Sequence, residues 1–333
     1  MAADYLESLI NTKKYPIIDR HSANYAKLVK AKQEEFVDTG VCLFSDFLLP
    51  DVTTKMCQEV LEIVEQAHEC HEIHNCFLGR VDNQTSPDEV RSIAQTTSLG
   101  VIGFDQLTED GSLVLLYQND KIRNFLGDIL GYREFYRLAD PIGAMTVNVM
   151  NSGHSHGWHF DEALFTVSVM LQSATGGGEF EYLSGVKNEQ RTNYTKLQDV
   201  LNGDNKGVRT IPIVPGSLLL FGGKHMLHRV TEVSGDATRL ITTLCRTFPI
   251  VFSLSLTALD PRILSTRGFI DALILIRISL RLPADRSGKL YGRRSMIFLA
   301  GALIETSDEE GACVDVIFPD ITSPKVFPCK NLL

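Results

Sequence analysis

The sequence lacks long apolar runs and any segment typical of membrane insertion or secretion. Its longest apolar stretch, Gly268–Leu280, contains Asp271 and Arg277 and is too short to span a bilayer roughly 30 Å thick. The first residues show no basic start followed by an apolar region, which a secretory signal would have. We therefore predict no membrane partner and a cytoplasmic location.

Positive charge is also in short supply. The chain has 32 Lys and Arg against 41 Asp and Glu, which gives a formal net charge of -9. Such a chain has no general attraction for phosphate backbones. The charge therefore argues against nucleic acid as a partner and favours a small-molecule substrate.

The cysteines lack the spacing of a zinc site. All seven are scattered without a CxxC pair, and an odd number suits reduced thiols better than a disulfide framework. This usage predicts an intracellular protein.

Two helices are predicted in the N-terminal part of the chain. Apolar residues including Met56 and Val60 recur at helical spacing over residues 51–74, with Asp51 as a possible cap. A second stripe covers residues 120–130, and Gly131 supplies the stop signal. We expect these helices to support another structural element.

From about Gly143 the pattern changes to short β-branched or alternating runs. They are MTVNVM, LFTVSVML, GEFEYL, TIPIV, SLLLF and RLITTL, separated by turn residues, and the glycines of GGGEFEY predict a hairpin. Many short strands at close spacing predict a β-sandwich or barrel. The predicted organisation is a helical region at 1–140, a β core at 141–250 and an atypical extension at 251–333, which shows neither clean alternation nor a helical period.

The stretch HGWHFDEALF, residues 156–165, places ionisable side chains directly before a buried strand. Side chains alternate along a strand, so His159 and Asp161 offer an imidazole and a carboxylate on one face, anchored by the strand LFTVSVML that the pair enters. A mononuclear non-haem Fe(II) site needs one more imidazole and open positions for a co-substrate and oxygen. His228, in the predicted strand HRVTEV, is the best candidate.

Arg239 opens the predicted strand RLITTL, eleven positions after His228. A guanidinium near an open metal site can hold a carboxylate by two parallel hydrogen bonds. Arg239 therefore suits a dicarboxylate co-substrate.

Each of these residues also has an ordinary interpretation. A lone HxD is common by chance, an isolated histidine is most often structural, and an arginine on a late strand is usually a surface charge. The order of the motifs favours the metal site. Other histidines are assigned supporting or structural roles (His154, His156 and His225), and the segment HECHEIHNC, with His68, His71, His74, Cys70 and Cys76, is predicted to be a solvated helix end.

The sequence resembles the Fe(II)/2-oxoglutarate-dependent dioxygenases of the double-stranded β-helix (jelly-roll) type, strongly over about residues 140–250 and weakly before them. The resemblance implies a mainly β fold, with a jelly-roll core packed on N-terminal helices. It also implies Fe(II) ligated by His159, Asp161 and His228, with Arg239 holding the distal carboxylate of 2-oxoglutarate, and O2 as the oxidant. Succinate and CO2 would be the co-products.

The residue pattern of DPIGAMTVNVMNSGHSHGWHFDEALFTVSVMLQ resembles that of a branch of the family that contains hydroxylases and radical halogenases of free amino acids. Halogenases of this type have a small residue in place of the carboxylate ligand, whereas this chain has Asp161. The resemblance therefore implies hydroxylation, desaturation or cyclisation of a small molecule. A free amino acid and a specialised metabolite are the two substrate classes that it suggests. Asn148, Trp158 and Glu162 are candidates to line its pocket, with a packing role as the alternative for Trp158 and Glu162.

Two other functions fit the same residues. The barrel could be a non-catalytic binding or scaffold module, or a cupin-like iron enzyme that does not use 2-oxoglutarate and has no need of Arg239. Dependence of turnover on 2-oxoglutarate separates these alternatives.

Overall fold

The computed structural model describes residues 2–82, 89–132, 135–138 and 140–247 and four short strands beyond them. Those strands are β16 (Ile278–Leu280), β17 (Arg294–Met296), β18 (Leu303–Glu305) and β19 (Asp315–Ile317), which pair as β16–β17 and β18–β19. The rest of the predicted extension at 251–333 lies outside the described residues. Met1–Arg137 and Ala144–Phe248 form one compact unit, and the predicted boundaries at 140 and 250 stay predictions.

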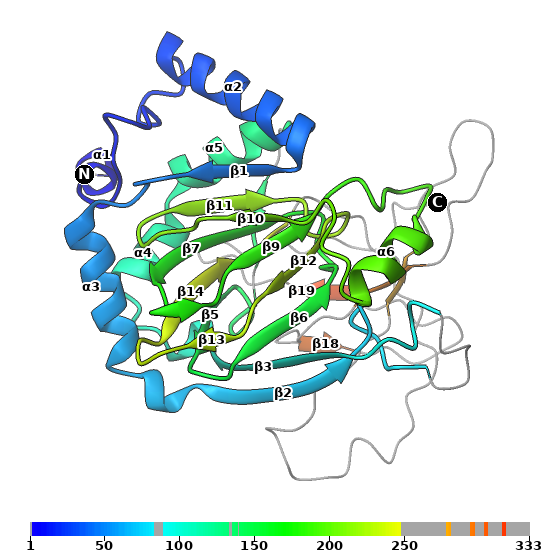
Figure 1. Cartoon of the computed structure of the whole chain (residues 1–333). Helices are drawn as coiled ribbons and strands as arrows, with labels where there is room; N and C mark the ends of the chain where they lie inside the picture. The colour runs from blue at the N-terminus through cyan, green and yellow to red at the C-terminus, as the bar shows by residue number, and fades with distance from the viewer. Residues whose placement is uncertain are drawn as a thin grey trace. The chain divides into compact units, whose positions relative to one another are not determined.

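The unit is built on antiparallel strands that alternate between two halves of one curled sheet (Figure 1). One half has the order β11 (Leu218–Phe221), β7 (Thr166–Gln172), β14 (Arg239–Leu244) and β5 (Met145–Met150). The other has the order β6 (Ser155–His159), β12 (Leu227–Val230), β9 (Phe180–Leu183) and β10 (Arg209–Ile211). This interleaved order is that of a jelly roll, so the predicted fold class is confirmed.

Three further strands extend the jelly roll. β3 (Gln95–Ile102) pairs with both β5 and β6 and so joins the two halves, while β1 (Val41–Phe44) pairs with β11. β2 (His68–His74) pairs with β3 along all seven of its residues. The β2–β3 hairpin is therefore an addition to the eight core strands, lying next to β6.

The glycines of GGGEFEY do not form the predicted hairpin. β8 (Gly176–Gly177) pairs with β13 (Val233–Ser234), not with β9. Gly177 has φ +61°, and a Cβ there would overlap the carbonyl of Glu232. The close approach of β13, a partner distant in sequence, decides this geometry, so the local pattern could not reveal it. The remaining pair is β4 (Tyr136–Arg137) with β15 (Arg246–Thr247).

The N-terminal helices cover the outer face of β5, β7 and β14. They are α1 (Ala2–Leu9), α2 (Ala23–Thr39), α3 (Pro50–Leu61), α4 (Ser112–Gln118) and α5 (Asp120–Leu130), with the short 3-10 helices η1 (Val64–Gln66) and η2 (Phe104–Gln106). Met56 of α3 and Phe125 of α5 share one apolar core with Val147 and Val167 of the sheet. The prediction that helices support the core is confirmed, as are the bounds of α5 and the left-handed C-cap at Gly131.

The prediction of one helix over residues 51–74 is wrong at both ends. Leu49 is the N-cap and Pro50 the first helical residue, so Asp51 lies in the first turn instead of capping it. The helix ends at Leu61, and the histidine-rich segment is β2, not a solvated helix end. The ladder with β3 supplies the backbone hydrogen bonds of β2, and no local periodicity can reveal partners that run from His74 with Gln95 to His68 with Val101.

Another helix, α6 (Tyr194–Leu201), lies by the second half of the sheet (Figure 1). Leu197 and Val200 pack with Trp158, Leu183 and Leu227 in a second apolar cluster. Helices therefore pack through apolar side chains on the outer face of each half of the jelly roll.

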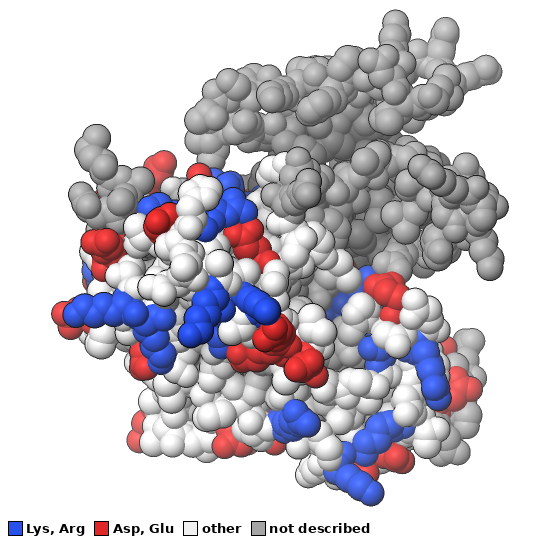
Figure 2. All heavy atoms as spheres, turned by 90° about the horizontal axis from the view of Figure 1, so that it is seen from above, with Lys and Arg blue, Asp and Glu red and all other residues white. Residues whose placement is uncertain are grey.

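Among the described residues, no helix has the length and apolar character to cross a membrane. On the described part of the face shown in Figure 2, basic and acidic side chains are intermingled and form no broad area of one sign. This face therefore gives no electrostatic footprint for a polyanion.

Candidate metal centre

The two histidines meet because their strands pair in register. His159 is the last residue of β6 and lies directly opposite His228 of β12. Side chains opposite one another in an antiparallel pair are neighbours, and the centres of the two imidazole rings are 4.1 Å apart.

Asp161 joins the histidines from a connection and not from a strand. β6 ends at His159 and β7 begins only at Thr166, so the HxD pair leaves one strand instead of entering the next, as the sequence had suggested. The prediction that Asp161 shares a strand face with His159 is therefore wrong, because the alternation of side chains does not continue past the end of β6. The turn into β7 brings the carboxylate back to the imidazoles.

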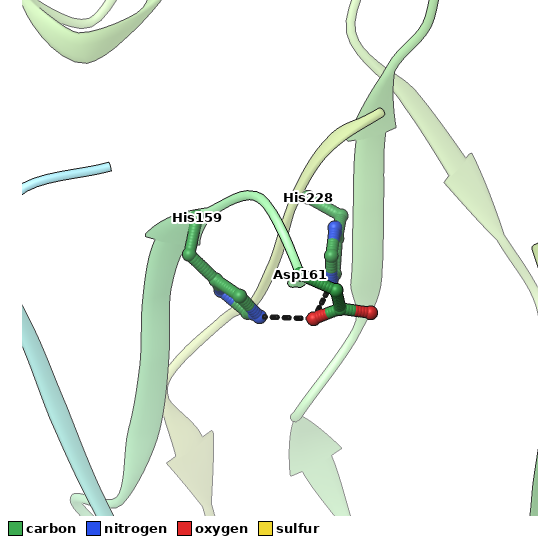
Figure 3. Close-up of side chains that lie close together, drawn as sticks. All are labelled: His159, Asp161 and His228. Atoms are coloured by element: carbon green, nitrogen blue, oxygen red, sulfur yellow. Dashed lines mark ion pairs between the residues drawn. The ribbon is translucent and has the colours of Figure 1, made fainter. Parts of the chain in front are cut away.

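The three side chains converge on one point (Figure 3). Oδ1 of Asp161 lies 3.4 Å from Nε2 of His159 and 3.4 Å from Nε2 of His228, and one ligand atom from each residue lies within 4.8 Å of the others. Both histidines are buried. Two imidazole nitrogens and one carboxylate oxygen are the donor set of mononuclear non-haem Fe(II) sites.

The second nitrogen of each ring is fixed by the backbone. Nδ1 of His159 lies 2.7 Å from the Gly157 carbonyl, and Nδ1 of His228 lies 3.0 Å from the Met226 carbonyl. A carbonyl only accepts, so each Nδ1 carries a proton, and in the neutral form of both rings each Nε2 turns a lone pair toward Asp161. Two lone pairs facing a carboxylate repel it, and a cation between them removes the repulsion. The donor set therefore fits a divalent metal.

The ionisation of these groups supports metal binding. Burial lowers the pKa of His159, and the neighbouring His228 lowers it further. Burial by itself raises the pKa of Asp161, but His228 and His159 outweigh it and hold this pKa well below its usual range. Near pH 7 the site accordingly favours an ionised carboxylate and a neutral His159, the forms that bind metals.

Two residues that the sequence did not indicate hold Asp161, one through its carboxylate and the other through its backbone amide. Thr166 donates its hydroxyl to Oδ2 of Asp161 at 2.5 Å, and the Asp161 amide donates to the Gly223 carbonyl at 3.0 Å. A Cβ at Gly223 would overlap Oδ2. The GG pair after SLLLF was visible in the sequence, but only the fold shows that the carboxylate packs against it.

Arg239, the first residue of β14, is 1% exposed. Its Nε donates to the Gly178 carbonyl at 2.8 Å and its Nη1 to Sδ of Met150 at 3.5 Å, whereas Nη2 is buried without a partner. Burial lowers the pKa of Arg239 to about 10. A buried guanidinium with an unused donor is costly unless an anion binds it, so this side chain fits a ligand carboxylate.

The three residues predicted to line a substrate pocket lie in different environments. Val147 and Val149 face the helix-covered core, so Asn148, between them on β5, faces the other side with Met150 and Arg239. Trp158 is buried in the second apolar cluster, with the Arg229 guanidinium 4.6 Å above its ring. Glu162 is exposed.

The three histidines to which the sequence assigned supporting or structural roles have different neighbours. The His156 ring stacks on that of His159, with centres 3.9 Å apart and planes at 17°. Nε2 of His154 lies 3.8 Å from Oε2 of Glu69, and Nε2 of His225 lies 3.2 Å from Oε1 of Glu189. Within the described residues, only His159, Asp161 and His228 form a cluster of three or more possible metal ligands.

The jelly roll and the match to a family model together place the chain among the 2-oxoglutarate-dependent dioxygenases of the jelly-roll type, and the resemblance seen in the sequence is confirmed. Within that class, the chain belongs to the Halogenase D family, whose model matches residues 24–248. The family name agrees with the halogenase-containing branch to which the sequence is similar. It describes the family and leaves the reaction of this chain open.

Solved structures include distant likenesses. The 2-oxoglutarate-dependent epimerase SnoN of nogalamycin biosynthesis is 11% identical, with a TM-score of 0.46 over 67% of this chain and 83% of that one. A prolyl-4-hydroxylase from Pseudomonas putida is 12% identical, with a TM-score of 0.41 over 66% and 97%. A Trichoplax adhaerens prolyl hydroxylase bound to a peptide is 16% identical, with a TM-score of 0.40 over 66% and 88%. No curated protein matches the chain.

Proposed function

We propose that this protein is an Fe(II)/2-oxoglutarate-dependent oxygenase that oxidises a C–H bond of a small molecule. His159, Asp161 and His228 would hold Fe(II), and Arg239 would bind the distal carboxylate of 2-oxoglutarate. When bound, these groups supply an oxidation in which O2, 2-oxoglutarate and the substrate give succinate, CO2 and an oxygenated product, or else succinate, CO2, water and a desaturated or cyclised product.

The observation that carries the proposal is the pairing of two incomplete sites. The triad turns two nitrogen lone pairs and a carboxylate oxygen toward one point, and Arg239 keeps a buried guanidinium nitrogen without a partner. A metal completes the first site and an anionic ligand completes the second. A cupin-like iron enzyme or a scaffold would need only one of these or neither.

The residues around the metal centre each have a definite task in this proposal. The carbonyls of Gly157 and Met226 hold the two imidazoles in the tautomer that binds metal. Thr166 occupies the outer oxygen of Asp161, so that the inner oxygen is offered to the metal. Arg239 orients the co-substrate, because its Nε is fixed by Gly178 and only the outer part of its fork is available.

We infer that oxygenation, desaturation or cyclisation is the outcome, and not halogenation. A halide needs a vacant position at the metal, and Asp161 fills one, with its carboxylate held by the Thr166 hydroxyl and its backbone amide by the Gly223 carbonyl. The substrate would be a small polar metabolite, such as a free amino acid or a specialised metabolite. Asn148, on the same sheet face as Arg239, remains a candidate for its pocket, as does Glu162. Trp158 fits its packing role better.

The first experiment is anaerobic titration of the protein with Fe(II) and 2-oxoglutarate. The proposal expects a weak visible charge-transfer band that is lost in His228→Ala and weakened in Arg239→Gln. Absence of the band in the parent protein, with no metal bound, would indicate a scaffold.

The second experiment is a screen of amino acids and related metabolites by mass spectrometry, scored by succinate release and by gain of oxygen or loss of two hydrogens. Turnover that continues without 2-oxoglutarate would indicate the cupin-like alternative. Succinate release stimulated only by a folded protein or an oligonucleotide would contradict the small-molecule substrate.

A further inference from the structure

His74 is a buried histidine that the metal centre does not use directly. It ends β2, is 5% exposed, and its ring lies edge-on to that of His159, with centres 6.5 Å apart. Nδ1 lies 2.9 Å from the Asn75 carbonyl, and Nε2 lies 2.7 Å from Oγ1 of Thr97 on β3. Both ring nitrogens thus have a partner in the described chain.

The direction of these hydrogen bonds follows from their chemistry. The Asn75 carbonyl only accepts, so Nδ1 of His74 donates and Nε2 accepts from the Thr97 hydroxyl. Oγ1 of Thr97 in turn accepts from the Gly157 amide at 3.3 Å. A hydroxyl can donate one hydrogen bond and accept another, so every group in the series is satisfied.

Gly157 carries the series to the metal centre. Its amide donates to Thr97, and its carbonyl accepts from Nδ1 of His159. The absence of a side chain is required here, because a Cβ at Gly157 would come within 2.8 Å of the Thr96 carbonyl. Four residues on three strands are therefore linked from His74 to the predicted ligand His159.

Other bonds from the β2–β3 hairpin hold the same segment. The Trp158 amide donates to Oε1 of Gln95 at 3.2 Å, and the Phe160 amide donates to the Cys76 carbonyl at 2.9 Å. The hairpin thus holds residues 157, 158 and 160, on both sides of His159. It lies outside the eight core strands of the jelly roll, so its attachment at this point is a separate feature of the chain.

We propose that His74 and Thr97 are positioning residues for His159. They hold the Gly157 peptide so that its carbonyl keeps the His159 ring in the orientation and tautomer that present Nε2 to a metal. The proposal rests on the proposed function, since it assumes that His159 binds the metal. Partners of this kind typically change metal affinity by 10- to 100-fold when removed, which is about the effect expected here.

The test is Co(II) titration of the full chain, followed by its visible ligand-field spectrum. Thr97→Val keeps the shape and removes the hydroxyl, Thr97→Ser keeps the hydroxyl, and His74→Phe removes both ring nitrogens. We expect Thr97→Val and His74→Phe to lower the Co(II) affinity at least 10-fold and to alter the spectrum, and Thr97→Ser to retain the parent behaviour.

Thr242→Val is the matched control. Thr242 is a fully buried strand threonine whose hydroxyl donates to the Thr146 carbonyl at 3.0 Å, beside residues that face the helix-covered core. We expect this variant to lose stability, measured by thermal unfolding, without change in Co(II) affinity. A general packing defect would therefore lower the Co(II) affinity of both Thr97→Val and Thr242→Val. A positioning defect would lower it only in Thr97→Val.

Two results overturn the inference and differ in what else they imply. If the parent binds Co(II), His159→Ala does not, and Thr97→Val binds it with unchanged affinity and spectrum, the inference fails while the metal site stands. If the parent binds no Co(II), or His159→Ala binds it equally well, the proposed function fails and the inference fails with it.

Discussion

Thr166 donates its hydroxyl to Oδ2 of Asp161, which leaves Oδ1 as the oxygen that faces both imidazoles. The two oxygens of one carboxylate therefore have different tasks. The outer one is bound by the protein, and the inner one is available to a metal. This division favours a ligand that uses one oxygen and keeps the remaining metal positions open for the co-substrates.

Removal of the Thr166 hydroxyl should loosen Asp161. Thr166→Val is expected to lower Co(II) affinity by roughly 10- to 150-fold, because a hydrogen bond to a charged group contributes about 1.5–3 kcal/mol. Thr166→Ser, which keeps the hydroxyl, should resemble the parent. Equal affinity in the valine and serine variants, measured by titration calorimetry, would show that the hydrogen bond does not position the carboxylate.

Each of the three predicted ligands should be necessary. His159→Ala, Asp161→Ala and His228→Ala are expected to abolish turnover and to lose bound iron, since the site keeps only two donors in each variant. Metal content by elemental analysis is the direct measurement. An iron content and activity of His228→Ala equal to those of the parent would exclude His228 as a ligand.

Arg239 should bind the co-substrate. Arg239→Gln is expected to raise the 2-oxoglutarate requirement far more than that for the main substrate, since loss of one partner of a desolvated charge pair costs about 2–5 kcal/mol. Without 2-oxoglutarate, Arg239→Met should be at least as stable as the parent in thermal unfolding, because it removes a buried charge with an unused donor. Equal changes in both requirements would indicate a structural role.

Metal affinity should persist into mildly acidic solution. Only a neutral imidazole binds the metal, and burial followed by His228 lowers the pKa of His159 below 6.5. Protonation therefore competes at His159 only below that pH, and the sign is a loss of affinity as the pH falls. Protonation of His159 should therefore weaken Co(II) binding, measured between pH 5 and 8, only below about pH 6.5. A midpoint above pH 7 would contradict this environment.

Asp161 should exclude chloride. With Fe(II), 2-oxoglutarate, oxygen, excess chloride and its substrate, the unmutated protein is expected to give oxygenated, desaturated or cyclised products and none that is chlorinated. Asp161→Gly vacates a metal position but also removes a group that orients the site, so loss of activity is its expected result. A chlorinated main product from the unmutated protein, detected by its isotope pattern, would show that Asp161 is not a ligand.

Local patterns predicted most of the core strands and the residues that converge in the candidate site, but neither strand β6 nor the contacts that hold these residues. The strand RLITTL, headed by Arg239, lies where the alternation placed it, and the order of the motifs pointed to residues that the fold brings together. The strand nature of His68–His74 could not be predicted, because its ladder partner is remote. The tasks of Thr166 and Gly223 were equally hidden, since a threonine at a strand start and a glycine after one are ordinary features.

Gly223 and Asp161 share one volume, because a Cβ at position 223 would overlap the carboxylate. The two positions are therefore not free to vary independently, and the order of substitution matters. Asp161 can be replaced while Gly223 is in place, whereas a larger residue at 223 fits without movement only after Asp161 has become glycine, because even the Cβ of residue 161 would lie 2.8 Å from a Cβ at 223. A lineage that took both steps could not regain the aspartate until position 223 had been emptied again. This one packing contact would therefore constrain the order in which descendants of such a chain can lose and regain the carboxylate at position 161.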